Sequence, residues 1–232
     1  MPFKKLSLLF ALMMVRCEFA NAQQAEFLPE VDVYLKLSTS IRLRAQASNT
    51  REGGDPTQAM IGSDVEFFVK PLISLKELAA FDLNDAKSRP LVLAAGYRYL
   101  AVPDSPSTNR MILAATSHLP IKPAFLLLSD KNRSDLDWSN GKFAWRYRNK
   151  FEVERPLVIR TYHPAPYASV EGYYESQYEK WSTTEVNVGC LFPIKKRFEF
   201  NAYYEHQNNT GKDPNRQLHG LGLTLDIYLS AK

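Results

Sequence analysis

The chain has 232 residues, of which 45% are hydrophobic and 12% aromatic, and its formal net charge is +4. This length suits one domain or two small ones, and charged residues at 23% beside many aromatics exclude a disordered chain. The hydrophobic content is too low for a protein with several membrane-spanning helices.

The first 22 residues have the three parts of a secretory signal peptide. Lys4 and Lys5 form a basic region, and residues 6–15 form an apolar run that is too short to cross a bilayer as a helix. Ala20-Asn21-Ala22 is a small-x-small cleavage site. We therefore expect cleavage after Ala22, with 1–22 as signal peptide and 23–232 as the mature domain.

Cleavage would change the charge and the cysteine content of the chain. It would remove three of the 29 Lys and Arg residues and one of the 25 Asp and Glu residues, which leaves a net charge of +2. So small a charge gives no support for nucleic-acid binding. Cys190 would be the one remaining cysteine, which excludes an intramolecular disulfide, and no apolar run of 18 residues follows the signal.

Apolar and polar side chains alternate along the whole mature chain. A period of two is typical of β-strands, because successive side chains point to opposite faces. In 142–156, for example, Phe143, Trp145 and Phe151 share one face and the charged residues share the other. The predicted strands, of which 110–118 and 124–133 have the weaker phase, are 30–37, 40–48, 61–70, 91–100, 110–118, 124–133, 142–156, 167–176, 184–192, 198–207 and 219–229. Only 73–81 has a helical pattern.

The lengths of the strands and of their connections favour a membrane barrel. Most of the predicted strands are longer than the five or six residues of ordinary strands and match the roughly nine to eleven that cross a membrane. Connections after the first, fifth and ninth strands are short, whereas 49–58 and 134–141 are among the longer, polar ones, as in outer-membrane barrels. The expected fold is all-β, an antiparallel up-and-down transmembrane β-barrel of about 10–12 strands. Because such barrels usually have even counts, we expect either a further strand near 23–29 or 71–90, or one strand that the pattern divides in two.

The charged faces of these strands would converge in the lumen of a closed barrel. Both signs are present, and side chains on neighbouring strands lie within pairing distance. We expect Arg146 and Arg148 to pair with carboxylates such as Glu171 and Glu175, because unpaired charges in a narrow space cost several kcal/mol each. The predicted lumen network is Arg42, Arg44, Asp64, Glu66, Arg98, Arg146, Arg148, Glu152, Glu171, Glu175, Glu199 and Glu205. A selective pore for a small charged solute is the alternative use of the same face.

Seven stretches resemble an uncharacterised family of bacterial outer-membrane β-barrels, domain of unknown function 2490. They are EVDVYLKLS, TREGGDPTQA, SRPLVLAAGYRYL, SDKNRSDLDW, WRYRNKFEVER, HPAPYASVEGYYESQYEKW and YYEHQNNTGK, and they lie between residues 27 and 229. The resemblance implies a barrel in the bacterial outer membrane, in contact with outer-membrane lipid and assembled by the barrel-assembly machinery. It brings no catalytic residue.

An enzyme is the weaker interpretation. His206, Asn208, Asn209 and His219 gather near one connection, and an outer-membrane phospholipase uses Ser, His and Asn, but this stretch holds no serine to act as nucleophile. The four histidines have no ligand spacing, so we expect no metal and no cofactor. The first interpretation is a structural barrel or a narrow channel with a charged lumen. An outer-membrane lipid-modifying enzyme and a soluble, lipocalin-like periplasmic barrel with apolar faces inward are the alternatives.

Overall fold

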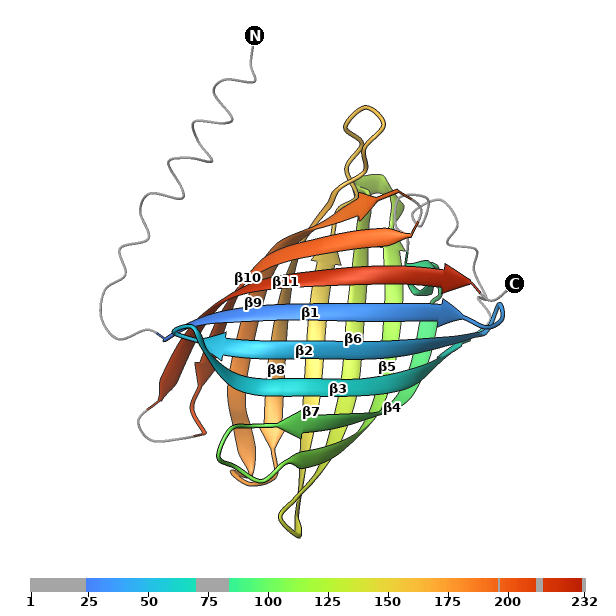
Figure 1. Ribbon diagram of the computed structural model, residues 1–232. Coiled ribbons are helices and arrows are strands. Elements are labelled where there is room, and N and C mark those ends of the chain that lie inside the picture. The colour runs from blue at the N-terminus through green and yellow to red at the C-terminus, as the bar shows by residue number, and fades with distance from the viewer. Residues whose placement is uncertain (1–23, 70–83, 196, 212–214, 231–232) are drawn as a thin grey trace, which may run out of the picture.

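Eleven strands close into one barrel in the computed structural model, which describes residues 24–69, 84–195, 197–211 and 215–230 (Figure 1). The strands are β1 (Gln24–Lys36), β2 (Ile41–Glu52), β3 (Asp55–Phe68), β4 (Leu91–Ala101), β5 (Thr108–Ile121), β6 (Leu126–Ser139), β7 (Lys142–Glu154), β8 (Ala165–Glu175), β9 (Lys180–Ile194), β10 (Phe198–Asn209) and β11 (Arg216–Ser230). Two short 3-10 helices, η2 (Asp85–Ser88) and η3 (Lys122–Ala124), complete the described elements. The predicted all-β barrel is confirmed, and the predicted signal peptide, its cleavage after Ala22 and the helical segment 73–81 lie outside the described residues.

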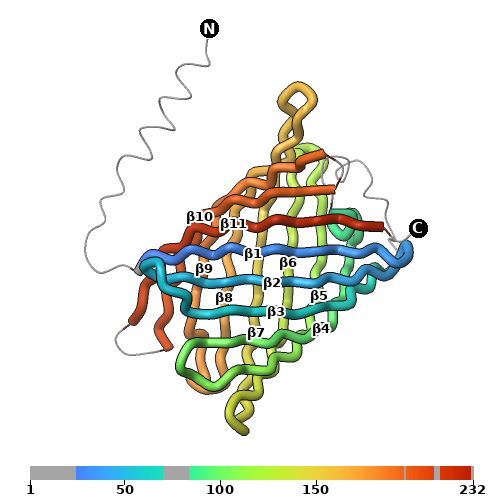
Figure 2. Tube along the Cα trace, viewed as in Figure 1, coloured from blue at the N-terminus to red at the C-terminus, as the bar shows by residue number. Residues whose placement is uncertain are grey.

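The barrel is not antiparallel throughout. Each strand pairs in antiparallel fashion with its neighbour in sequence. β1 and β11 lie side by side (Figure 2) and pair in parallel, with Val31 opposite Leu225. The prediction of a wholly antiparallel barrel is therefore wrong at this pair. The reason is arithmetic: when directions alternate through an odd number of strands, the first and last strands run the same way.

The further strand expected in 23–29 or 71–90 is not part of the barrel wall. Residues 24–29 are the start of β1. Phe68 of β3 pairs with Val92 of β4, so the two strands are direct neighbours in the wall. Residues 70–83 of the second expected region lie outside the described residues. The barrel closes with the eleven strands that the alternation predicts.

Two connections predicted as long loops are tight hairpins. β2 and β3 are joined by Gly53 and Gly54, and β6 and β7 by Asn140 and Gly141, with positive φ at all four residues. Positive φ at both central residues is the mark of a type I′ turn, which matches the twist of the strands it joins. The residues expected in loops 49–58 and 134–141 are therefore mostly paired strand.

The two faces of the barrel wall differ in chemistry. Glu185 and Asn187 of β9 line a cavity inside the barrel. Val186 and Val188, which alternate with them along the strand, therefore point outward, where they are 41% and 57% exposed. Large apolar side chains are exposed in the same way on strands around the barrel, whereas charged side chains are buried inside. A small apolar cluster of Phe68, Ala86 and Val92 lies where η2 meets the barrel.

Candidate functional site

Polar side chains from strands around the barrel line a cavity of about 440 Å³ in its lumen. A second cavity of about 280 Å³ lies toward η2. Arg44, Lys131 and Lys150 line both cavities, so the two adjoin at these three basic side chains. The lumen is therefore a charged and partly hollow interior.

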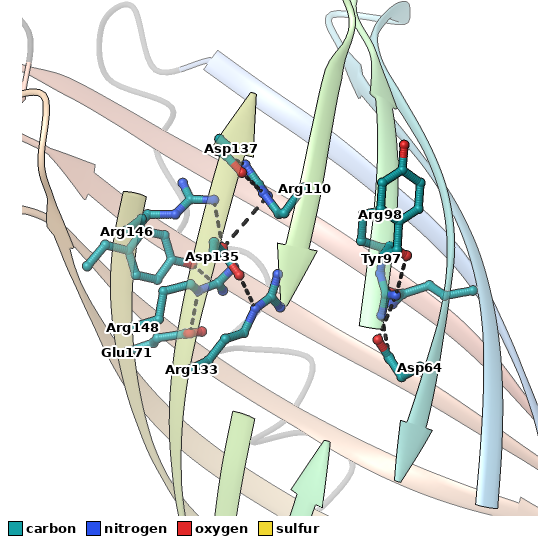
Figure 3. A network of polar contacts seen from close by, with 12 residues as sticks. Asp64, Tyr97, Arg98, Arg110, Arg133, Asp135, Asp137, Arg146, Arg148 and Glu171 are labelled. Atoms are coloured by element: carbon teal, nitrogen blue, oxygen red, sulfur yellow. Dashed lines mark hydrogen bonds and ion pairs between the residues drawn. The ribbon is translucent and has the colours of Figure 1, made fainter. Parts of the chain in front are cut away.

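One ion cluster joins β2, β3 and β4 around Asp64. Arg98 donates to both carboxylate oxygens of Asp64, at 2.8 and 2.6 Å, and Arg44 donates to the same group through Nε at 2.7 Å (Figure 3). Both side chains of the Arg98–Asp64 pair are 1% exposed. Gly62 lies opposite Arg98, and a Cβ at Gly62 would overlap the arginine side chain. Gly96 lies opposite Asp64, and a Cβ at Gly96 would overlap the carboxylate. The two glycines make room for the ion pair.

A second cluster centres on Asp135 of β6, which is fully buried. Arg133 donates to it at 2.6 Å and Arg146 at 3.1 Å, and Arg110 lies at 3.8 Å while forming two hydrogen bonds with Asp137 (Figure 3). The sequence pattern missed four of these residues, because it gave 110–118 and 124–133 a weak phase and placed 134–141 in a loop. The alternating carboxylates of Ser-Asp-Leu-Asp, residues 134–137, are the signal that marks this strand.

The paired strands β7 and β8 bring together the arginines and glutamates that the alternation places on one face. Arg148 donates to Glu171 at 2.7 Å and to the Tyr173 hydroxyl at 2.8 Å. Arg146 reaches Glu175 at 3.4 Å. Glu152, also in the predicted network, lies 3.3 Å from Lys150 on its own strand.

The short helix η2 is held at one end of the lumen by ionic contacts. Arg42 donates to Glu66 at 2.7 Å, to Asn84 at 2.7 Å and to Asp85 at 3.2 Å. Lys36 lies 2.5 Å from Asp85. At the far side of the helix, Lys87 pairs with Glu154. Asn84, Ala86 and Lys87 all line the second cavity, so this helix narrows that end of the barrel.

Two carboxylates of the predicted network have other surroundings. Glu199 accepts a hydrogen bond from the Tyr228 hydroxyl at 3.4 Å. Glu205 lines the larger cavity together with Glu26, Glu30 and Glu185. An acidic wall thus faces the cavity from β9, β10 and β1.

A polar cluster that the sequence pattern did not single out lies on the outer face of β6 and β7. Asn149 donates to Asp130 at 2.7 Å and to Asn132 at 3.2 Å, and the Tyr147 hydroxyl bonds Asn132. These residues alternate with Lys131 and Lys150, which face the lumen. Polar side chains on both faces explain why the apolar alternation is weak here.

The histidine-containing stretch forms an outward-facing aromatic group. His206 of β10 lies directly opposite His219 of β11, with ring centroids 4.7 Å apart, and the Tyr204 hydroxyl contacts His219 Nδ1. In the described part of the chain, no three His, Cys, Asp or Glu side chains are arranged to hold a metal ion. No helix among the described residues is long and apolar enough to cross a membrane.

Comparison with known proteins reveals similarity of fold. No model of a known protein family matches the sequence, and no curated protein matches it. A solved bacterial polysaccharide outer membrane secretin is similar with a TM-score of 0.50 and 10% identity, over 80% of this chain. The chain spans 63% of the length of that secretin. The beta domain of the Bordetella autotransporter Brka is more distant, with a TM-score of 0.44, 14% identity, and coverage of 78% of this chain and 81% of that one. The secretin shares the barrel fold with this chain.

Proposed function

We propose that the protein is a bacterial outer-membrane β-barrel with a narrow, charge-lined lumen, made with a cleaved signal peptide and belonging to the family of domain of unknown function 2490. Its lumen network serves first to hold the strands in register. In this proposal the barrel contacts outer-membrane lipid and is inserted by the barrel-assembly machinery.

The observation that carries the proposal is the inside-out distribution of side chains. Val188, Leu113 and Ile61 are 57%, 49% and 62% exposed on the outer face, while Asp135 and Arg98 are at most 1% exposed inside. In water this arrangement would lose the main driving force of folding, whereas lipid solvates the apolar face. A closed barrel also satisfies its backbone hydrogen bonds, as a membrane span must. A lipocalin-like barrel would have the opposite arrangement.

Strand length and an aromatic girdle support the same proposal. The strands have 11 to 15 residues, more than the roughly nine to eleven that a tilted strand needs to cross the hydrocarbon core. Outward aromatic rings cluster near one end of the barrel: Trp145 stacks on Tyr174 at 5.6 Å, and Trp181 meets Tyr174 edge-on at 6.0 Å. Aromatic girdles of this kind lie at membrane interfaces.

A narrow channel is the second candidate for the lumen. The observation that favours it is the pair of adjoining cavities, which together extend from the aromatic end of the barrel to η2. The ion pairs that cross the lumen wall leave these spaces open. A solute that follows this path would have to pass the basic side chains of Arg44, Lys131 and Lys150.

Fractionation tests the proposed location. The full chain expressed in a Gram-negative host should be recovered in the outer-membrane fraction without residues 1–22. It should also migrate faster when the sample is not boiled, because closed barrels resist unfolding by detergent. A variant without residues 2–22 should stay in the cytoplasm. Recovery of the full chain in the soluble periplasm would contradict the proposal.

A further inference from the structure

Among the described residues, the basic side of the lumen includes Lys131, a lysine without a direct ion-pair partner. Lys131 of β6 lies directly opposite Lys150 of β7, and Arg133 lies directly opposite Arg148. Like charges in opposite positions are unfavourable. Three of the four have a carboxylate within 3.3 Å, at Asp135, Glu171 or Glu152. Lys131 makes no ion pair or hydrogen bond with any described residue.

The acidic side holds the complementary feature. Glu171 of β8 lies directly opposite Glu185 of β9, and Glu185 accepts hydrogen bonds from Tyr173 and Asn187. Glu205 of β10 is only 9% exposed, yet within the described part of the chain it has neither a hydrogen bond nor an ion pair. A carboxylate buried to this extent is costly unless it is paired.

Both uncompensated groups face the same space. Lys131 and Glu205 line the cavity of about 440 Å³, although β7, β8 and β9 separate their strands on the shorter way around the barrel. Among the described residues, the cavity therefore has an unpaired lysine on one wall and an unpaired glutamate on another. Its volume lies within the range of small-molecule pockets, and the tyrosines Tyr167 and Tyr203 also line it.

We propose that this cavity binds a small organic zwitterion, with its acidic group at Lys131 and its ammonium group at Glu205. An organic ammonium fits better than a bare metal ion, because no three carboxylate or histidine side chains among the described residues converge on one point. A bound anion would leave Glu205 buried without a partner. A bound cation would leave Lys131 without a partner. The inference deepens the proposed function and rests on it for the route by which the solute reaches the lumen.

Binding to the purified intact barrel tests the inference. In detergent at low ionic strength, calorimetry would compare 6-aminohexanoate with hexylamine and hexanoate, which each have one of its charges. We expect the zwitterion to bind at least about tenfold more tightly than either, since a hydrogen bond to a charged group is worth roughly one such factor. Equal binding of hexanoate or of hexylamine, or no binding of any of the three, would overturn the inference without requiring a variant.

Variants then locate the two ends of the solute. Lys131→Gln and Glu205→Gln should each weaken 6-aminohexanoate binding about tenfold or more. The double swap Lys131→Glu with Glu205→Lys should restore it, because the solute can bind in reverse. Lys142→Gln and Asp55→Asn remove the same charges at exposed turns and should leave binding unchanged. A difference in migration between boiled and unboiled samples shows which variants are folded. Folded Lys131→Gln and Glu205→Gln variants with undiminished affinity would contradict the assignment of these residues to the two ends of the solute. If the barrel binds the zwitterion but is found outside the outer membrane, only the proposed location is refuted.

Discussion

At the scale of single residues, Asp64 is the best example of how the lumen is stabilised. One carboxylate accepts hydrogen bonds from Arg98 on one neighbouring strand and from Arg44 on the other. Gly96 and Gly62 leave the space that the pair occupies. The charged side chains of β2, β3 and β4 and the glycines beside them therefore fit one another. Neither the charges nor the glycines predict this cluster without the other.

Removal of Asp64 should be much more harmful than removal of a carboxylate at the rim. Asp64→Ala leaves buried Arg98 uncompensated, and we expect a loss of about 3–5 kcal/mol in the free energy of unfolding. The control is Glu52→Ala at the Glu52–Arg216 pair, whose arginine side chain is 41% exposed, with an expected cost of about 0–1 kcal/mol. Urea unfolding in lipid vesicles would measure both. Equal midpoints for the two variants would show that the Asp64 cluster does not stabilise the barrel.

At the scale of elements, the turn of the β6–β7 hairpin carries a clear local sequence signal. Asn140-Gly141 between alternating segments is among the strongest short-range signals for a hairpin. The polar residues before it suggested a loop, yet Asp135 and Asp137 pair with arginines inside the barrel. Polarity predicts a loop only where no charged lumen is available to receive the side chains.

The helix η2 is the element that should decide whether the lumen conducts. It narrows one end through Asp85, which contacts Lys36 and Arg42, and through Lys87, which contacts Glu154. We expect low conductance from the wild-type protein in planar bilayers. The double variant Asp85→Ala with Lys87→Ala should conduct several-fold more, because the second cavity would open at that end.

A matched control for this measurement lies at the other end of the barrel. Asp55→Ala with Lys142→Ala removes the same two charges from the exposed ends of β3 and β7. Its conductance should equal that of the wild type. If the η2 variant is folded and conducts no more than this control, η2 does not close the lumen.

At the scale of the whole molecule, the odd strand count fixes where the first strand begins and the last strand ends. Because β1 and β11 run parallel, the start of β1 and the end of β11 lie at opposite ends of the barrel (Figure 1). Thirteen residue pairs, from Gln24 and Leu218 to Lys36 and Ser230, form this closing seam. The parallel pairing of β1 and β11 is as extensive as the antiparallel pairings of the other strands. Closure of the barrel therefore does not require an even number of strands.

Cys190 provides a test of the proposal that the outer face of the barrel contacts lipid. It lies on β9 in phase with the outward-facing Val186 and Val188 and would be the one cysteine of the mature chain. In intact outer membranes, a lipid-soluble maleimide should label Cys190 and a charged maleimide should not. Lys142→Cys in a Cys190→Ser background should react with both reagents at its exposed turn. Rapid labelling of Cys190 by the charged reagent would reverse the face assignment.

The sequence by itself determined the strands and their two faces. Val186 and Val188 alternate with Glu185 and Asn187 within a few residues, and such a period depends only on local backbone geometry. The same phase put Arg146 and Arg148 on one face with Glu171 and Glu175 on the next strand, where the structure has them in contact. Adjacent strands are close in sequence, so the alternation of side chains can predict ion pairs between them.

Only the tertiary structure decided how many strands close the barrel and which charges remain unpaired. The parallel seam joins residues about two hundred positions apart, and no local pattern encodes that register. Glu205 has the same alternation as its paired neighbours, but the arginines of β7 reach Glu171 and Glu175 rather than Glu205. Whether a lumen charge finds a partner depends on distances across the closed barrel, and those distances exist only after the last strand has joined the first.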